Sequence, residues 1–187
     1  SDRVKTKGIT DQKSSGRCWL FTGLNVMRAK MIDKYDLGSF TFSQNYLFFY
    51  DQLEKANLFL QGVIDTRRLP FADRQVDWLF SNPLSDGGQF TGVSDLAMKY
   101  GVVPSEIMPE TYSSNNTSQM ASQLKNILRQ GGLKLRDVYD ASGAASLSGK
   151  KAEAAEAKVN AELQKVKESV LSDVYRVLAL CLGVPPT

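Results

Sequence analysis

Apolar side chains recur at helical spacing along most of the chain, and they predict a mainly helical structure. In 18–31 the apolar positions fall three and four residues apart, and in 150–182 one apolar stripe runs along a segment without proline or glycine. The same periodicity predicts helices over 18–31, 44–64, 73–81, 90–100, 117–130 and 150–182. We expect the first of these to be buried at its start, where it is apolar nearly all round.

Polar residues, glycines and prolines divide these helices. Ser43 is placed to cap the helix over 44–64, and Asn82-Pro83 and Gly101 end the third and fourth helices. Gly131-Gly132 is predicted to end the fifth helix, and the alternation of Leu133, Leu135 and Val138 then predicts a short strand. The segment 141–149 is small and rich in Ser and Gly, as in a flexible joint.

The most informative feature of the composition is that one residue type, histidine, is absent. The chain has 187 residues, 42% hydrophobic and 23% charged, which suits one globular domain or two small ones. It contains no histidine, so Ser-His-Asp and Cys-His catalysis are excluded from a self-contained chain. With two cysteines, a zinc site built from Cys and His is excluded as well. We expect no metal and no cofactor.

Charge and cysteine content bear on partners and compartment. The net charge is +3, and residues 1–17 carry five basic against two acidic residues. A short basic N-terminal segment of this kind is usually only solvated, and weak binding to nucleic acid is the alternative. No apolar run reaches the length of a membrane span, so we expect no membrane association. Two cysteines favour a reducing, cytoplasmic compartment, or export if a signal peptide preceded Ser1.

Four aromatic residues, Tyr46, Phe48, Phe49 and Tyr50, lie close together in the second predicted helix. They can form either a packed core or a surface on which bases stack. The core interpretation is the simpler one, because aromatic side chains contribute much of the area that a core buries.

The most informative chemistry surrounds Cys18. A cysteine in the first turn of a helix feels the partial positive charge of the helix end, which favours the thiolate. Gly16 allows a tight turn just before it, and the Cys18 backbone N–H can face a developing oxyanion. The Gln12 side-chain amide can fold back as a second donor. Without the surrounding sequence, however, a lone cysteine on an apolar helix is most often a small buried hydrophobic residue, and that would be the expectation for Cys18.

The surrounding sequence resembles papain-like cysteine peptidases, in which Gln, five further residues and Cys-Trp stand at the head of the central helix. The stretch 12–19, followed by Phe21 and 24–28, looks more narrowly like the bleomycin hydrolase and aminopeptidase C branch. Further stretches that agree are 42–49, 82–83, 86–89, 99–104, 109–112, 175–177 and 181–186. The resemblance covers nearly the whole chain and is loosest over 113–170.

The resemblance implies a role for each matching residue. Cys18 would be the nucleophile and Gln12 the oxyanion-hole side chain, while Trp19 would pack rather than react. Asp86, Gly87 and Gly88 would form a wall that pairs with an extended substrate, since bare glycine backbone lets a peptide approach. Without the resemblance, this Asp-Gly-Gly segment would be merely a turn.

The resemblance also implies the fold and what this chain leaves out. The expected fold is the α+β papain-like fold, of which the given portion is mainly α with few strands. We expect 1–112 to be its helical, nucleophile-bearing half and 113–187 a helical insertion ending in a long helix. The catalytic histidine and asparagine of the family belong to a downstream β-rich half, so we expect the isolated chain to be inactive.

The implied activity is hydrolysis of peptide bonds through a Cys acyl-enzyme, mostly as an aminopeptidase acting on peptide substrates. Members of this branch form hexameric rings, so a homo-oligomer is expected. Two alternatives remain from the residues themselves. One is a non-catalytic binding or scaffold protein that retains only the helical half. The other is a nucleic-acid binder that uses Arg3, Lys5 and Lys7.

Overall fold

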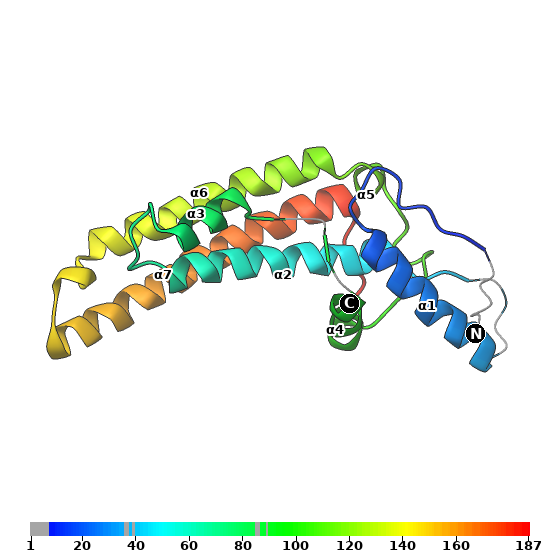
Figure 1. The fold of residues 1–187 in the computed structure, drawn as a ribbon, viewed down its shortest axis with the longest axis horizontal. Helices are drawn as coiled ribbons and strands as arrows, with labels where there is room; N and C mark the ends of the chain where they lie inside the picture. The colour runs from blue at the N-terminus through cyan, green and yellow to red at the C-terminus, as the bar shows by residue number, and fades with distance from the viewer. Residues whose placement is uncertain (1–7, 36–37, 39, 85–86, 89) are drawn as a thin grey trace. The chain divides into compact units, whose positions relative to one another are not determined.

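The chain is a succession of helices joined by irregular segments (Figure 1). This computed structural model describes residues 8–35, 38, 40–84, 87–88 and 90–187. Its elements are α1 (Cys18–Tyr35), α2 (Gln44–Asp65), α3 (Arg74–Ser81), α4 (Phe90–Tyr100), α5 (Tyr112–Asn115), α6 (Ser118–Ser142), the 3-10 turn η1 (Ala144–Ser146) and α7 (Gly149–Leu182). Extended pairing within the described residues is limited to isolated bridges, Ser14 with Asn116 and Phe42 with Pro104. The prediction of a mainly helical portion is confirmed.

The helix ends follow the polar residues that the sequence places there. The Tyr46 backbone N–H donates to the Ser43 hydroxyl at 3.0 Å, which confirms Ser43 as the cap of α2. Asp73 caps α3 by accepting the Gln75 N–H. After α4 the chain turns at Gly101 with φ of +77°, a conformation that glycine adopts without a steric penalty.

The predicted break at Gly131-Gly132 is wrong, and so is the strand predicted after it. Helix α6 continues through both glycines to Ser142. A Cβ on Gly131 would lie 2.8 Å from the Val170 methyl groups, and one on Gly132 would lie 2.9 Å from the Phe80 ring. The glycines are therefore places of close packing between elements, and that packing outweighs their poor helix propensity.

The described chain divides into two compact units. Unit 1 comprises Ser1–Gln52, Asp86–Met120 and Leu178–Thr187, and unit 2 comprises Leu53–Ser85 and Ala121–Val177. Both units are therefore built from segments far apart in the sequence. The predicted division after residue 112 is a continuous one and stays a prediction.

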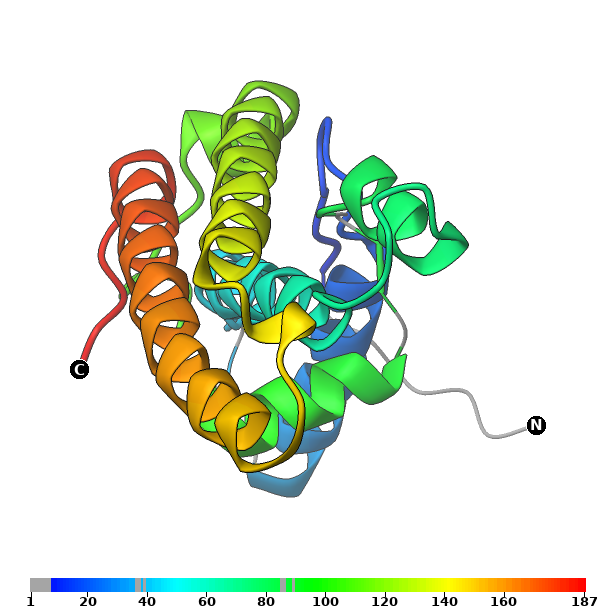
Figure 2. The same cartoon turned by 90° about the vertical axis from the view of Figure 1, so that its left-hand side faces the viewer.

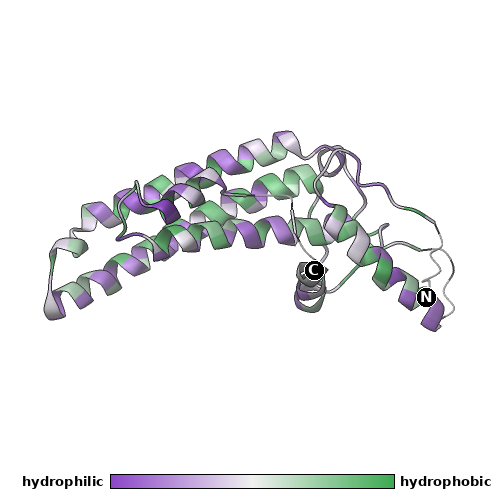
Figure 3. Cartoon of the chain, viewed as in Figure 1, coloured by the Kyte–Doolittle hydropathy of each residue, from purple (hydrophilic) through white to green (hydrophobic). Residues whose placement is uncertain are grey.

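Unit 2 is helical and apolar at its centre. Its parts of α6 and α7 lie side by side and are connected through η1 (Figures 1 and 2). Hydrophilic and hydrophobic residues alternate along both helices (Figure 3). The apolar stripe predicted for 150–182 is buried at Val159, Leu163, Val170 and Val174 within this unit. Its burial accounts for the stability of the long helix, which propensity alone would not supply.

Unit 1 contains α1, α4 and the first part of α2. Helix α1 packs against α4 with Gly23 in contact with Val93, where a Cβ would lie within 3 Å of the valine side chain. As expected, the start of α1 is largely buried, at Trp19, Leu20, Phe21 and Leu24. Tyr46, Phe48 and Phe49 are buried too, so the aromatic group of α2 is packed core, as expected.

Candidate active site

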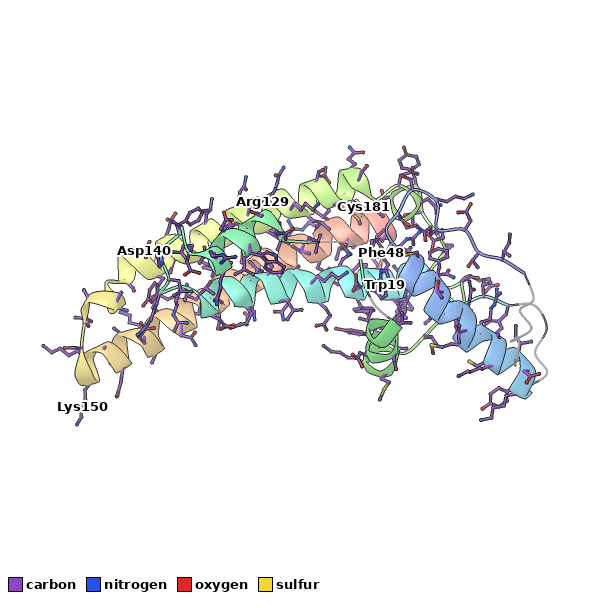
Figure 4. All side chains as sticks on the ribbon, viewed as in Figure 1. Trp19, Phe48, Arg129, Asp140, Lys150 and Cys181 are labelled. Atoms are coloured by element: carbon purple, nitrogen blue, oxygen red, sulfur yellow. The ribbon has the colours of Figure 1, made fainter. Side chains whose placement is uncertain are left out.

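Cys18 is the first residue of α1, and its side chain is exposed. The alternative of a small buried hydrophobic residue is therefore wrong for this cysteine. Its immediate neighbours Arg17 and Trp19 are both buried (Trp19 is labelled in Figure 4). The exposed thiol thus lies at the positive end of α1, where the backbone N–H groups of the first turn have no partner within the helix.

The loop before α1 is closed by hydrogen bonds between Gln12 and Ser15. The Gln12 Nε2 donates to the Ser15 carbonyl at 2.7 Å, and the Ser15 hydroxyl donates back to the Gln12 carbonyl at 2.6 Å. Between them Lys13 has φ of +53°, and its N–H donates to the Asp11 carboxylate. A primary amide has two N–H bonds, so this arrangement holds the Gln12 amide while one N–H remains for another acceptor.

Backbone pairing attaches the same loop to the segment after α5. The Ser14 N–H donates to the Asn115 carbonyl at 2.9 Å, and the Thr117 N–H donates to the Ser14 carbonyl at 3.3 Å. Thr10, which lies farther upstream, is held by α1, because the Asn25 side-chain amide donates to the Thr10 hydroxyl at 2.7 Å. The segment 10–17 is therefore positioned by contacts on two sides.

Arg17 has a fully buried side chain, although the sequence places it in a basic segment expected to be solvated. For this residue that expectation is wrong. The guanidinium donates to both carboxylate oxygens of Glu110, at 3.1 and 2.9 Å, and its Nε donates to the Ser15 hydroxyl at 2.8 Å. It also lies over the rings of Phe21 and Phe48, which is a favourable position for a cation. Arg3, Lys5 and Lys7 lie outside the described residues.

Glu110 is held in turn by residues at the start of α5. The Ser114 hydroxyl donates to the Glu110 carboxylate at 2.6 Å. Thr111 and Ser114 form a reciprocal capping box, and the Thr111 hydroxyl donates to the Cys181 carbonyl at 2.7 Å. The carboxylate that neutralises Arg17 is thus itself fixed by a buried hydroxyl.

The Gly-Gly segment lies beside the residue that follows Cys18. Gly88 is so close to the Trp19 indole that a Cβ on it would come within 2.6 Å of the ring. Because an indole is rigid, no residue other than glycine fits there without displacing Trp19. The structure therefore brings together Gly88 and the start of α1, which are 70 residues apart in the sequence; Gly87 is exposed, and Asp86 lies outside the described residues.

Arg17 and Glu110 lie next to the candidate site, but the sequence by itself indicates no function for either residue. Both stand within stretches that match the papain-like pattern, and Arg17 directly precedes the apolar start of a helix. The signal in the sequence was a charged residue directly before the apolar start of a helix. An arginine is seldom buried without a partner, so Arg17, if buried there, would need an acidic one. No group of three or more potential metal ligands occurs within the part of the chain described here.

Geometry and sequence together define a helix with an exposed thiol at its start, preceded by a closed loop that holds a glutamine amide. The chain matches the Peptidase C1-like family over residues 1–187, and it belongs to that family. Aminopeptidase C of Lactobacillus delbrueckii subsp. lactis is 40% identical over 186 residues, which cover 100% of this chain and 38% of that protein. Human bleomycin hydrolase is 37% identical over 182 residues, covering 96% of this chain and 37% of that protein.

A solved structure agrees with the fold. The crystal structure of PepW from Lactobacillus rhamnosis HN001 superposes with a TM-score of 0.84 and 37% sequence identity, covering 98% of this chain and 38% of that one. The chain therefore has the fold of the corresponding part of a bleomycin hydrolase-like peptidase, as the resemblance implied. It spans less than two fifths of the length of these relatives. No helix within the described residues is long and apolar enough to cross a membrane.

Proposed function

We propose that the protein carrying this chain is a cysteine peptidase, with Cys18 as nucleophile and Gln12 as an oxyanion-hole donor. The observation that carries the proposal is the exposed Cys18 thiol at the start of α1, next to the closed loop that holds Gln12. Membership of the Peptidase C1-like family, with relatives named aminopeptidase C and bleomycin hydrolase, supports it.

The proposed reaction is acyl transfer to the thiol. The Cys18 thiolate attacks the carbonyl carbon, and the Gln12 amide and the Cys18 N–H stabilise the negative oxygen that develops. The amine leaves after it is protonated, and water then hydrolyses the thioester. This sequence needs a general base and acid, and the chain contains no histidine. We assign that role to a histidine, oriented by an asparagine, in a part of the protein outside these 187 residues.

The substrate is proposed to be a peptide that pairs with the backbone at Asp86, Gly87 and Gly88 and is cleaved from its amino end. The exposure of Gly87 and Gly88 and the closeness of Gly88 to Trp19 support a peptide-binding wall next to Cys18. In this proposal residues 1–112 form the nucleophile-bearing half of the papain-like fold and 113–187 a helical insertion.

We further propose an oligomeric state and a cellular compartment for the complete protein. We expect a homo-oligomer, hexameric as in the branch that the sequence resembles, which light scattering of the complete protein tests directly. Both cysteines are free thiols, which is compatible with a reducing, cytoplasmic compartment and with a thiol nucleophile.

The decisive experiment compares the two cysteines in the full-length protein. Cys18→Ser is expected to lower kcat for an aminoacyl anilide by about 10⁴-fold or more, since the nucleophile is lost. Cys181→Ser, at a half-buried position, is the matched control and should retain activity. Iodoacetamide should label Cys18 well before Cys181. Equal slow labelling, or a wild-type protein without peptidase activity, would favour the non-catalytic binding protein instead.

A further inference from the structure

Arg17 and Cys18 are adjacent in the sequence, but their side chains lie in opposite environments. Cys18 is exposed, whereas the Arg17 side chain is fully buried. The Arg17 charge is neutralised by Glu110 through two bonds, at 2.9 and 3.1 Å, so it does not act as a bare cation on the neighbouring thiol. Its contacts therefore suggest a geometric role rather than activation of Cys18.

The guanidinium contacts both members of the turn that holds the Gln12 amide. Its Nε donates to the Ser15 hydroxyl at 2.8 Å, and Nη2 lies 3.5 Å from the Gln12 carbonyl oxygen. The Ser15 hydroxyl donates to this same carbonyl, and the Gln12 amide donates to the Ser15 carbonyl. Ser15 is thus bonded to Arg17 on one side and to Gln12 on the other.

The other end of the guanidinium is anchored in the protein interior. Glu110 accepts from Arg17 and also from the Ser114 hydroxyl, which is buried. The rings of Phe21 and Phe48 lie 4.9 and 5.3 Å from the guanidinium carbon and restrict its plane. The planar guanidinium of Arg17, fixed by these contacts, holds the groups bonded to it in place. The flexible ammonium group of a lysine would hold them less firmly.

We propose that Arg17 is a positioning residue for the Gln12 amide, holding it through Ser15 in the geometry that the oxyanion requires. This inference rests on the proposed cysteine peptidase function. It assigns Arg17 no contact with substrate. A donor displaced by about 1 Å loses much of its value to the transition state, so the effect should appear in kcat.

The test uses Arg17→Lys in the full-length protein, with an aminoacyl anilide as substrate. We expect kcat to fall about 10²-fold with KM within threefold of the wild type, because oxyanion stabilisation acts in the transition state. Alkylation of Cys18 by iodoacetamide forms no oxyanion, so its rate and pH profile should stay within twofold. Arg28→Lys is the matched control. Arg28 is also a buried arginine, but it donates to the Gly8 carbonyl and not to the Gln12–Ser15 turn, and we expect an unchanged kcat.

A double-mutant cycle identifies the residue through which Arg17 acts. In a Gln12→Ala background, Arg17→Lys should lower kcat less than threefold further, since the amide that it positions is gone. A full 10²-fold loss in that background overturns the inference, and so does a fall in the alkylation rate that parallels the fall in kcat. If Arg17→Lys fails to fold, Ser15→Ala removes the same link and retains the ion pair. It should lower kcat about 10-fold, again with no further loss beside Gln12→Ala, and an unchanged kcat overturns the inference.

The positioning role of Arg17 and the proposed peptidase function can be disproved separately. Cys18-dependent hydrolysis that Arg17→Lys leaves unchanged overturns the positioning role alone. Absence of Cys18-dependent hydrolysis in the wild-type protein overturns the proposed function, and the positioning role falls with it.

Discussion

The contacts inside unit 1 differ in kind from the contacts inside unit 2. Unit 1 buries several polar side chains that donate to backbone carbonyls of other segments, and these include Asn45, which donates to the Pro109 carbonyl at 2.9 Å and to that of Leu182, the last residue of α7, at 2.7 Å. Ser43 donates to the Met108 carbonyl. Unit 2 brings its helices together mainly through apolar side chains and through glycines in close contact, such as Gly131 against Val170, although its buried Arg136 also donates to the Leu69 carbonyl at 2.7 Å.

The difference follows from the proportion of irregular backbone in each unit. A helix satisfies its own N–H and C=O groups, so its contacts can be apolar. A loop lacks such a ladder, and its buried carbonyls need donors from side chains or from other segments. The candidate active site is built on such loops, and the buried Arg17 side chain there bonds to Ser15 and Glu110. Charge burial is therefore expected to matter more to unit 1, and close packing more to unit 2.

The largest expected effect compares two carboxylates, one in each unit. Glu110→Gln leaves the fully buried Arg17 without its counter-charge, and we expect the free energy of unfolding to fall by about 3 kcal/mol. Glu156 in unit 2 accepts from Arg67 and Arg68, whose side chains are 22% and 64% exposed. Since solvent can stabilise those cations, Glu156→Gln should cost only about 1 kcal/mol.

Urea unfolding of the two variants beside the wild type measures this difference. A loss for Glu156→Gln equal to or larger than that for Glu110→Gln would contradict the contrast between the units.

A smaller effect tests the packing of unit 2. Ala is a better helix former than Gly by about 1 kcal/mol, so an exposed Gly→Ala change in a helix should stabilise it. Gly131→Ala is expected to destabilise instead, by about 1–3 kcal/mol, because the added methyl group would overlap the branched Val170 side chain.

Gly62→Ala in α2 is the matched control. Its new methyl group would meet only the far end of the Leu79 side chain, at 3.0 Å, which can move aside. We expect it to be neutral or slightly stabilising in thermal unfolding. A stabilising Gly131→Ala would show that α6 does not need its glycine for packing.

The smallest expected effect is the pH dependence contributed by Glu156. The pKa of its carboxyl is lowered from 4.5 to about 2, first by the hydrogen bond from the Tyr139 hydroxyl and then by those from Arg67 and Arg68. A depressed folded-state pKa adds stability above the unfolded-state value, and this stability is lost as pH falls from about 5 toward 2. Solvent screening around the 64% exposed Arg68 limits the contribution to about 1 kcal/mol, the same size as the expected cost of Glu156→Gln.

The Tm of the wild type should therefore fall more steeply over this range than that of Glu156→Gln. Asp173→Asn, which breaks an exposed pair with Arg176, is the control and should follow the wild-type slope. Parallel curves for the wild type and Glu156→Gln would remove Glu156 as a source of acid sensitivity.

Most of the secondary structure could be predicted because it depends on local chemistry. Helical periodicity located α1, α2, α4 and α7, and the polar residue Ser43 marked the start of α2. The error at Gly131-Gly132 has a different origin. Glycine is a helix stop when judged by propensity, and only the neighbouring Val170 and Phe80 explain why the helix continues there.

The candidate site was predictable in its reactive groups but not in its supports. Cys18 and Gln12 lie six positions apart in a recognisable motif, so the sequence alone indicates them, and their catalytic roles remain to be tested. The partner of Arg17 lies 93 positions away, and nothing in the local sequence shows that the arginine is buried.

By itself, then, the sequence determines the helices, their caps and the presence of a cysteine motif, because these depend on residues within a few positions of one another. The tertiary structure decides that Cys18 is exposed while Arg17 is buried, that Gly88 lies against Trp19, and that α6 passes through two glycines. These outcomes depend on which distant segments meet. Burial of a charge and close contact at a glycine arise where distant segments pack together, so no single stretch of the chain encodes them.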